Sequence, residues 1–401
     1  MKTWGARQGQ GQGPWAACSR VAAGVGLGIV IAACGGSGGG QANESPLQVV
    51  TLVSGLDHPW SLAFLPDRRM LVTERPGRLR LVSADGQMVS GPISGVPTVF
   101  SQGQGGLFDI ALAPDFASSR VVYLSYAEPG SGADAGKNGT AVMRATLNAD
   151  ATALTAGEVI FRQTPKVAST GHFGGRLAFA RNGDLFLTLG ERLSTAEREK
   201  AQDLSQGHGK VMRMRADGSA SPDNPFLGVP GTQPTVWSLG HRNPQGAAIH
   251  PDTGELWSIE HGPQGGDELN IVQAGRNYGW PRVSYGCEYG APVGNCTPVG
   301  GASTGPGFEP PLTHWVPVSI APSGMAFYTG SGFPEWRGNL FVGALAGKAL
   351  WRITLDGHTV VDRQVLLTDL GQRLRDVRQG PDGWLYLLTD DSNGRILRLQ
   401  R

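Results

Sequence analysis

The chain has 401 residues and a formal net charge of +1, and only 17% of its residues are charged. This balance gives no broad electropositive field, so a protein that recruits nucleic acid through such a field is excluded. The composition is marked instead by 61 Gly and 27 Pro without a collagen-like period. With 40% apolar residues and ten Trp, this favours a turn-dense all-β fold with a packed core over disorder.

Residues 1–33 have the features of an export signal. Lys2, Arg7 and Arg20 precede an uncharged stretch, residues 21–33, which is too short to span a bilayer comfortably. We therefore expect a signal peptide over residues 1–33 that is not part of the fold.

Cys34 directly follows small residues, and this arrangement resembles a bacterial lipobox, in which the cysteine is acylated and becomes the mature N-terminus. We expect a periplasmic protein whose membrane contact is a lipid anchor at Cys34. Residues 34–45 are then a flexible Gly/Ser-rich tether. Ordinary cleavage near Ala33, with a free soluble product, is the alternative.

Residues 46–401 carry six copies of one pattern: a short apolar strand, a turn rich in Pro, Asp, Asn or Gly, and a second strand. Asn-Gly and Asp-Gly dipeptides between alternating apolar runs are strong hairpin signals. We predict an all-β fold, a six-bladed β-propeller with four-stranded antiparallel blades, over residues 46–401. A β-sandwich is the alternative, but sandwiches rarely need so many residues. The copies lie at residues 61–74, 108–124, 177–187, 247–257, 325–342 and 377–387.

The function of a propeller lies in the loops around its channel, so the polar residues in the segments between strands are the functional candidates. His172 lies in Gly-His-Phe-Gly-Gly-Arg-Leu, directly before a predicted inner strand. A neutral imidazole takes hydroxyl protons near pH 7. The alternative is a histidine that only completes a loop hydrogen bond.

Arg242 and Asn243 lie in Gly-His-Arg-Asn-Pro-Gln-Gly, again before an inner strand. Arginine offers a planar fork for carboxylates or quinone oxygens, and asparagine both donates and accepts hydrogen bonds. The alternative is a turn with an exposed arginine. In the next loop, residues 260–270, a Gly-Pro corner with carboxylates suits Ca²⁺. Zinc is disfavoured because His261 has no second histidine at i+4.

Cys287 and Cys296 lie close together in a Gly-rich stretch. An exported protein meets an oxidising compartment, so we predict a local disulfide between them. A metal-binding pair would need further Cys or His at ligand spacing, and none is adjacent.

The three loops, in this order, together with residues 277–281 (Asn-Tyr-Gly-Trp-Pro) and 319–328, resemble the glucose/sorbosone dehydrogenase family. The likeness is closest to its aldose sugar dehydrogenases that depend on pyrroloquinoline quinone (PQQ), and it covers nearly the whole chain after the leader. It implies PQQ and Ca²⁺ as cofactors and an aldose sugar oxidised at C1 to a lactone by hydride transfer to the quinone. The electrons would pass to an acceptor such as a c-type cytochrome or a membrane quinone.

The resemblance also implies roles for individual residues. His172 matches the general base that takes the anomeric hydroxyl proton. Arg242 and Asn243 match residues beside the reactive carbonyl of the cofactor, where a cation stabilises developing negative charge. Gly262 and Pro263 match the two backbone carbonyls that bind the Ca²⁺ of the cofactor.

Other positions match the edges of the cofactor site. Gln104 matches a glutamine at the edge of substrate and cofactor, and Arg373 and Arg375 match two arginines that hold carboxylates of the tricarboxylate PQQ. The lysine of the glucose-type enzymes aligns with Ala346, and we expect Lys348 to reach the same carboxylate from two residues further on; the alternative is a lysine that faces solvent.

Glu268 and Tyr278 resemble ligands of a second, structural calcium site, completed by Glu288. The alternative for Glu268 is a solvated loop carboxylate. Glu191 stands where the family pattern leads us to expect Asp, and this departure makes strict glucose specificity doubtful.

Two other classes of protein remain as alternatives. A calcium-dependent lactonase needs several side-chain carboxylates converging on one ion, whereas basic groups surround the candidate ligands here. A cofactor-free binding propeller would keep the repeats but need not keep His172, Arg242 and the Arg373/Arg375 pair together. A nicotinamide enzyme is excluded because no Gly-x-Gly-x-x-Gly opens a helix after a strand.

Overall fold

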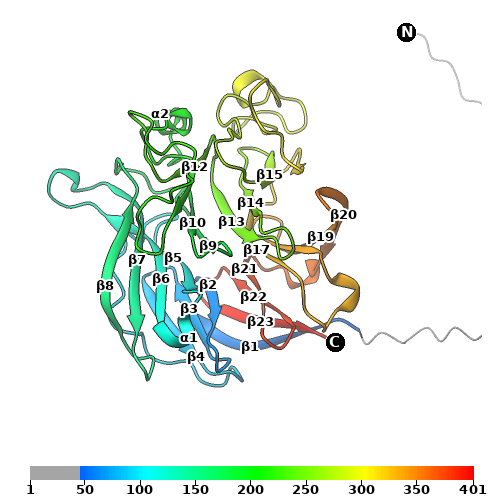
Figure 1. Ribbon diagram of the computed structural model, residues 1–401. Coiled ribbons are helices and arrows are strands. Elements are labelled where there is room, and N and C mark those ends of the chain that lie inside the picture. Colours follow the sequence, from blue (N-terminus) through cyan, green and yellow to red (C-terminus); the bar gives the residue numbers. More distant parts are fainter. Residues whose placement is uncertain (1–45) are drawn as a thin grey trace, which may run out of the picture. The chain divides into compact units, whose positions relative to one another are not determined.

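The computed structural model describes residues 46–401. The predicted signal peptide, the lipid anchor at Cys34 and the tether over residues 34–45 lie outside the described residues. Residues 46–401 form six antiparallel sheets around a central axis (Figure 1), which confirms the predicted six-bladed propeller. Among the described residues, no helix combines the length and the apolar character that crossing a bilayer requires.

Each of the six sheets is one blade, and five of them have four strands, as predicted. The remaining blade, formed by β2, β3 and β4, has three strands. In chain order, the blades comprise β2 (Pro59–Phe64), β3 (Met70–Glu74) and β4 (Arg78–Val82); β5 (Leu107–Leu112), β6 (Val121–Pro129), β7 (Asn138–Leu147) and β8 (Leu154–Arg162); β9 (Gly174–Phe179), β10 (Leu185–Leu189), β11 (Lys210–Met214) and β12 (Val236–Leu239); β13 (Pro244–Ile249), β14 (Leu256–Glu260), β15 (Asp267–Ile271) and β16 (Thr313–Trp315); β17 (Pro322–Phe327), β18 (Leu340–Ala344), β19 (Ala349–Asp356) and β20 (Thr359–Leu366); and β21 (Leu374–Gln379), β22 (Leu385–Thr389), β23 (Gly394–Gln400) and β1 (Gln48–Leu56).

The last blade combines the two ends of the described chain. Strand β1 pairs antiparallel with β23, from Gln48 opposite Gln400 to Leu56 opposite Gly394. Leu56 is fully buried in the core that this blade shares with the first one. Because each blade buries its faces against its neighbours, this pairing closes the ring and leaves no gap between the first and last blades.

The innermost strand of each blade lines the central channel; these strands are β2, β5, β9, β13, β17 and β21 (Figure 1). Each of these strands is the first of its blade's consecutive antiparallel strands, and all six run in the same direction along the channel. The loops that precede the inner strands therefore meet at one mouth of the channel. The motif loops with His172, Arg242 and Arg373 are all loops of this kind.

A buried ionic network crosses the channel between the inner strands. The Arg176 guanidinium lies 3.1 Å from Asp376 and 3.4 Å from Asp109, and Arg378 contacts the same two carboxylates at 2.8 and 2.9 Å. The four groups come from β5, β9 and β21. Since buried carboxylates and guanidinium groups are costly unless paired, this network links distant blades in a fixed arrangement.

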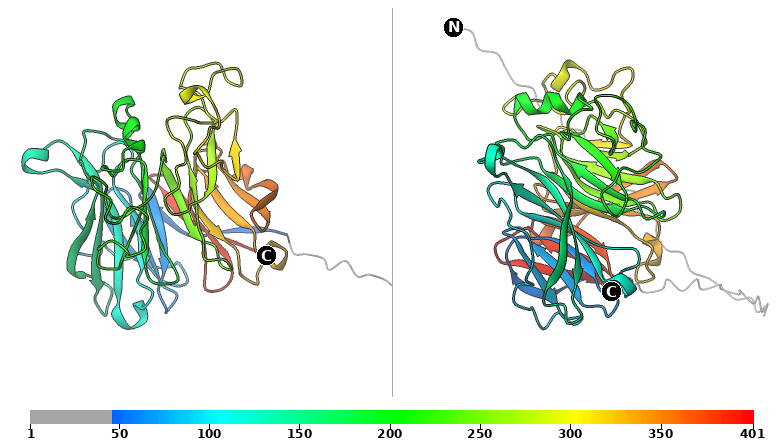
Figure 2. Two further views of the ribbon diagram at one scale, coloured as in Figure 1. Left: turned by 45° about the horizontal axis from the view of Figure 1, so that its top comes forward. Right: turned by 60° about the vertical axis from the view of Figure 1, so that its left-hand side comes forward.

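Helical structure is short and lies in the loops. Helices α1 (Phe116–Ser119) and α2 (Thr195–Arg198) have one turn each, and α2 continues as the 3₁₀ turn η2 (Glu199–Gln202). Ser194 caps α2 through its side chain, as expected for an N-cap serine. Figure 2 shows α2 and the segment around residue 300 projecting from the same end of the sheets.

Candidate active site

A cavity of about 550 Å³ opens at the mouth where the inner strands begin. Residues from separate blades line it, among them Trp60, Gln104, Gln245, His261 and Arg375. The loops before β2, β5 and β21, strand β13 and the residue after β14 thus contribute to one space. A second cavity of about 500 Å³ lies at the opposite ends of the same strands, and most of the residues that line it are of apolar type. Of the predicted site residues, Gln104, Arg373 and Arg375 line the first cavity. Arg242, Gly262, Glu268 and Tyr278 line a separate small cavity that shares His261 with it.

His172 is held rigidly in a buried position beside this cavity. Its side chain is 4% exposed, and its Nδ1 lies 3.0 Å from Oε1 of Glu191. Its backbone N–H donates to Oε1 of Gln104 at 2.8 Å. The φ of 48° is unusual for a residue other than glycine and marks a position that the surroundings impose. The backbone of His172 packs closely against Gly190, and only glycine fits there because a Cβ would lie 2.1 Å from the His172 carbonyl oxygen.

The surroundings of His172 keep its imidazole neutral. Burial and the positive charge of Arg242 lower the pKa of His172 below its usual 6.5, although the hydrogen bond that His172 donates to Glu191 opposes this effect. A carboxylate at Nδ1 favours the tautomer with the proton on Nδ1, since a carboxylate can only accept there. Nε2 then carries the lone pair. His172 is therefore prepared to take a proton.

Arg242 is fixed by several acceptors, but part of its guanidinium is left without one. Nη1 donates to the carbonyl oxygens of Gly262 (2.6 Å) and His261 (3.1 Å), and Nη2 lies 3.3 Å from the Tyr289 hydroxyl. Nε of Arg242 is buried without a hydrogen-bond partner among residues 46–401. A buried donor of this kind is costly unless a ligand supplies the acceptor.

Asn243 has a similar half-satisfied arrangement. Its Oδ1 accepts from the backbone N–H of Gly174 at 3.2 Å, so the amide orientation is defined by this bond. Within the described part of the chain, its buried Nδ2 has no partner. The two adjacent residues of the Arg-Asn pair thus offer free donors, as a site for quinone or carbonyl oxygens would require.

Arg373 and Arg375 form a cationic wall of the cavity with one carboxylate between them. Both guanidinium groups contact Asp390, at 2.9 and 3.0 Å. Although burial raises the pKa of Asp390, Arg375 and Arg373 lower it overall, so this carboxyl is ionised. Arg375 also donates to Gln245 at 2.7 Å, and its buried Nε has no partner within residues 46–401. Arg75 and Asp391 also line the cavity, so three guanidinium groups face two carboxylates there, and this net positive charge suits an anionic ligand.

Lys348 differs from the expectation. It lies exposed in the turn between β18 and β19, with φ of 46°, and the exposed Ala346 precedes it by two residues. Leu345 is the residue of this turn that lines the cavity. Lys348 is thus exposed and is not among the residues that line the cavity, which corresponds to the alternative of a solvent-facing lysine.

Asp267 holds the Gly262–Pro263 corner against the next blade. Its carboxylate accepts from the Gly262 N–H (2.9 Å), the Ser319 hydroxyl (2.8 Å) and the Ile320 N–H (2.7 Å). Burial raises the pKa of Asp267 to about 6, against the effect of these donors. The corner is thus fixed beside the cavity, and the carbonyl oxygen of Gly262 accepts a hydrogen bond from Arg242.

Glu268 and Tyr278 border one small cavity together with Glu260. Burial and the charge of Glu260 raise the pKa of Glu268 well above its usual value. The Tyr278 hydroxyl is engaged elsewhere, donating to the Ile271 carbonyl at 2.5 Å. Within residues 46–401, no three His, Cys, Asp or Glu side chains are arranged to hold a metal ion.

Glu288 is not brought to this cavity, contrary to the expectation. Its half-exposed carboxylate pairs with Arg198 of α2 at 2.6 Å. The predicted disulfide between Cys287 and Cys296 is confirmed. Because the bridge fixes the short segment between the two cysteines, the neighbouring Glu288 points toward α2.

Comparison with known proteins supports one family for this arrangement. Residues 56–398 match the family model described as Glucose / Sorbosone dehydrogenase. The aldose sugar dehydrogenase YliI of Escherichia coli strain K12 is 47% identical, covering 89% of this chain and 94% of that protein. The chain belongs to the glucose/sorbosone dehydrogenase family.

Solved structures agree with this assignment to an oxidoreductase family. A crystal structure of a glucose dehydrogenase is 53% identical with a TM-score of 0.82, over 88% of this chain and 99% of that one. The PQQ-bound aldose sugar dehydrogenase of Streptomyces coelicolor is 32% identical with a TM-score of 0.71, over 88% of this chain and 98% of that chain.

Sequence reasoning noted Glu191 and the carboxylates of residues 260–270, but it did not identify Glu191, Glu260 and Asp390 as partners of the site residues. Glu191, Glu260 and Asp390 each lie at or just after the end of the second strand of a hairpin. In an antiparallel hairpin this end lies beside the start of the first strand, where His172, Arg242 and Arg373 are found. The signal was present in the sequence, as a carboxylate at the end of each second strand, and pairing the two strand ends would have found it.

Proposed function

We propose that this protein is a PQQ- and Ca²⁺-dependent aldose sugar dehydrogenase that oxidises the C1 hydroxyl to a lactone. The observation that carries the proposal is a neutral, carboxylate-oriented His172 whose backbone is bonded to Gln104, a residue that lines the cavity together with Arg75, Arg373 and Arg375. Binding and hydrolytic propellers need no such combination. The aldose sugar dehydrogenases among the relatives support the same substrate class.

The donors of the cavity fit PQQ, a flat tricarboxylate with a quinone. Arg373 and Arg375 would hold carboxylates, and the free Nε of Arg242 and Nδ2 of Asn243 would face quinone oxygens. When bound, PQQ supplies the quinone that accepts hydride from C1. The protein contributes orientation, charge and a proton acceptor.

His172 takes the proton of the anomeric hydroxyl at Nε2. Glu191 accepts from Nδ1, so it fixes the ring and stabilises the imidazolium that forms. The positive charge of Arg242 opposes that imidazolium but favours negative charge on the acceptor. Glu191 thus favours the proton on His172, and Arg242 favours the electron pair on the acceptor.

The Gly262–Pro263 corner would hold the Ca²⁺ of the cofactor through backbone carbonyl oxygens, which are ligands that calcium accepts. Asp267 supports this role because it fixes the corner. The pair Glu260 and Glu268 supports a second calcium, since two neighbouring carboxylates raise the free energy of each other unless a cation or a proton neutralises them.

Export and an outside electron acceptor belong to the same proposal. The predicted leader would carry the protein to the periplasm, and a disulfide is compatible with that oxidising compartment. A c-type cytochrome or a membrane quinone would then receive the electrons.

Reconstitution tests the proposed function. Purified apoprotein is mixed with PQQ and Ca²⁺, and dye reduction is followed over a panel of aldoses, with chelator and PQQ-free samples as controls. We expect reduction only in the complete mixture. Silence across the panel, without a spectral sign of bound quinone, would favour a binding propeller instead.

A further inference from the structure

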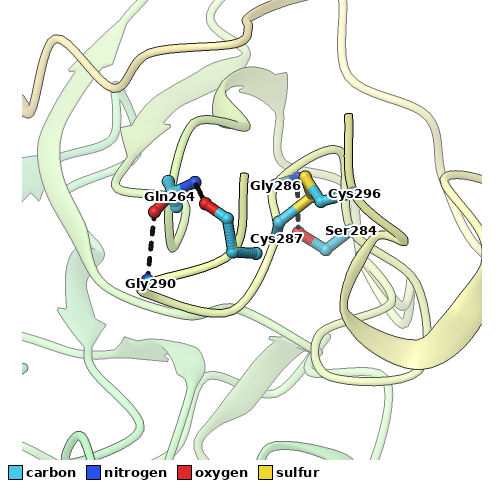
Figure 3. Close-up of a disulfide and its surroundings, with 7 residues drawn as sticks. Gln264, Ser284, Gly286, Cys287, Gly290 and Cys296 are labelled. Carbon is cyan, nitrogen blue, oxygen red and sulfur yellow. Dashed lines mark hydrogen bonds between the residues drawn. A yellow bond between two sulfur atoms is a disulfide. The ribbon is translucent and has the colours of Figure 1, made fainter. Parts of the chain in front are cut away.

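The segment between the two cysteines, residues 287–296, is tied to the corner beside the cavity; we call it the cystine loop. The disulfide joins its ends across a Cα–Cα distance of 6.2 Å. The side chain of Gln264 donates to the Ala291 carbonyl at 2.6 Å and accepts from the Gly290 N–H at 3.2 Å (Figure 3). Gln264 and Cys287 also exchange backbone hydrogen bonds at 2.9 and 3.1 Å. The loop is therefore held in place from two sides.

The cystine loop presents one aromatic ring to solvent beside Arg242. Tyr289 is 68% exposed, which is exceptional for a tyrosine of this chain. Its hydroxyl lies 3.3 Å from Nη2 of Arg242, and its ring centre lies 5.9 Å from that guanidinium. The ring of Trp280 lies 5.3 Å from the same guanidinium. Tyr289 is thus directly attached to a residue of the candidate site.

We propose that Tyr289 is a substrate-positioning residue, whose exposed ring is the platform for the apolar C–H face of an aldopyranose. This inference rests on the proposed function, because it concerns the sugar of that same reaction. An aromatic ring offers a large contact area at a small cost in conformational entropy. The attachment to Gln264 and the disulfide keeps this surface in place before the sugar arrives.

The chemistry around Tyr289 favours a sugar over a purely apolar ligand. A pyranose has an apolar face and a rim of hydroxyl groups, and the ring lies beside the guanidinium donors of Arg242. Polar groups at the edge of an apolar surface fix the orientation of such a ligand. The alternative is that Tyr289 only restrains Arg242 through its hydroxyl.

Two substitutions separate the ring from the hydroxyl. Tyr289→Phe removes the hydrogen bond to Arg242 and keeps the ring, whereas Tyr289→Ala removes both. We expect Tyr289→Ala to raise KM for the best aldose of the panel about 5- to 10-fold with a smaller change in kcat, and Tyr289→Phe to keep KM within about 2-fold. The double substitution Cys287→Ser with Cys296→Ser should raise KM in the same direction, because it releases the platform.

Binding without turnover gives a second readout. The 1,5-anhydro analogue of that aldose lacks the anomeric hydroxyl, so it binds but is not oxidised, and calorimetry on the PQQ-loaded protein measures its affinity. We expect Tyr289→Ala to weaken it about 5- to 10-fold. Val361→Ala, on the outer strand β20 and 62% exposed, is the matched surface control and should change nothing.

The outcomes distinguish the two proposals. If kcat falls equally in Tyr289→Phe and Tyr289→Ala while KM and analogue affinity stay native, Tyr289 only restrains Arg242 and the platform is overturned, whereas the proposed function stands. If the native protein binds neither PQQ nor the analogue, both proposals fail. PQQ affinity, followed by absorbance, should be equal in native protein and Tyr289→Ala.

Discussion

His172, Arg242 and Arg373 each start from the same local geometry. Each lies just before an inner strand, and a carboxylate at the end of the next strand reaches it: Glu191 for His172 at 3.0 Å and Asp390 for Arg373 at 2.9 Å. For Arg242 the contact goes through its backbone N–H, which donates to Glu260 at 2.6 Å. One hairpin thus supplies both a functional group and the partner that orients it.

Replacing His172 tests the base directly. We expect His172→Ala to lower kcat by about 10²- to 10⁴-fold while PQQ affinity stays near native, because the imidazole handles the proton and does not hold the cofactor. Saturating aldose kinetics and an absorbance titration measure the two quantities. His358→Ala is the matched control, since that histidine is 54% exposed on an outer turn. Dye reduction at the native rate by His172→Ala would exclude His172 as the base.

The pH profile follows from the lowered pKa of His172. The base works only when neutral, and its neutral form persists below the usual 6.5, so kcat/KM should fall only as pH drops through a value under 6.5. Glu191 raises this pKa, so Glu191→Gln should move the acidic limb to still lower pH and reduce kcat through loss of ring orientation. A limb that moves to higher pH in Glu191→Gln contradicts this assignment.

Among the elements, strand β1 decides whether the ring is closed. Strand β1 comes from the start of the described residues, whereas the other three strands of its blade come from the end of the chain. Its residues Val53 and Leu56 are buried in the core shared by the first and last blades. Closure therefore depends on burial at this one strand as well as on its backbone pairing.

Truncating the closing strand should destabilise the whole propeller. We expect Leu56→Ala to lower the free energy of unfolding by about 2–5 kcal/mol, because it leaves a cavity in a fully packed core. Val361→Ala, exposed on β20, should change it by no more than about 0.5 kcal/mol. Urea titrations of both variants give the comparison. Equal stability of the two variants would show that β1 is not needed for closure.

The strands were predictable to a large extent, and the directions of loop side chains were not. Alternating apolar runs with Asn-Gly or Asp-Gly turns define the hairpins, and the motif loops before inner strands defined where His172 and Arg242 would meet. Spacing along a turn does not fix where a side chain points, so the sequence could not show that Lys348 faces solvent. Likewise, the partner of Glu288 is Arg198, ninety positions earlier in the chain, which no local pattern could indicate.

At the scale of the whole molecule, the propeller brings single residues of distant blades to one channel mouth. Gln104, His172, Arg242 and Arg375 come from four different blades. Gln104 and Arg375 line the cavity, His172 is bonded to Gln104, and Arg242 is bonded to His261, which also lines it. The ionic network of Arg176 and its partners links the inner strands. No blade holds this set alone. We therefore expect the assembled ring to bind one polyanionic cofactor at this mouth.

Equilibrium binding of PQQ to the apoprotein tests this expectation most directly. An absorbance or calorimetric titration in the presence of Ca²⁺ should give one bound PQQ per chain. Arg373→Gln, at a half-exposed position where folding is not at risk, should weaken it about 10-fold or more through loss of a charge-assisted hydrogen bond. Absence of binding to the native protein, or equal affinity in native protein and Arg373→Gln, would contradict the account.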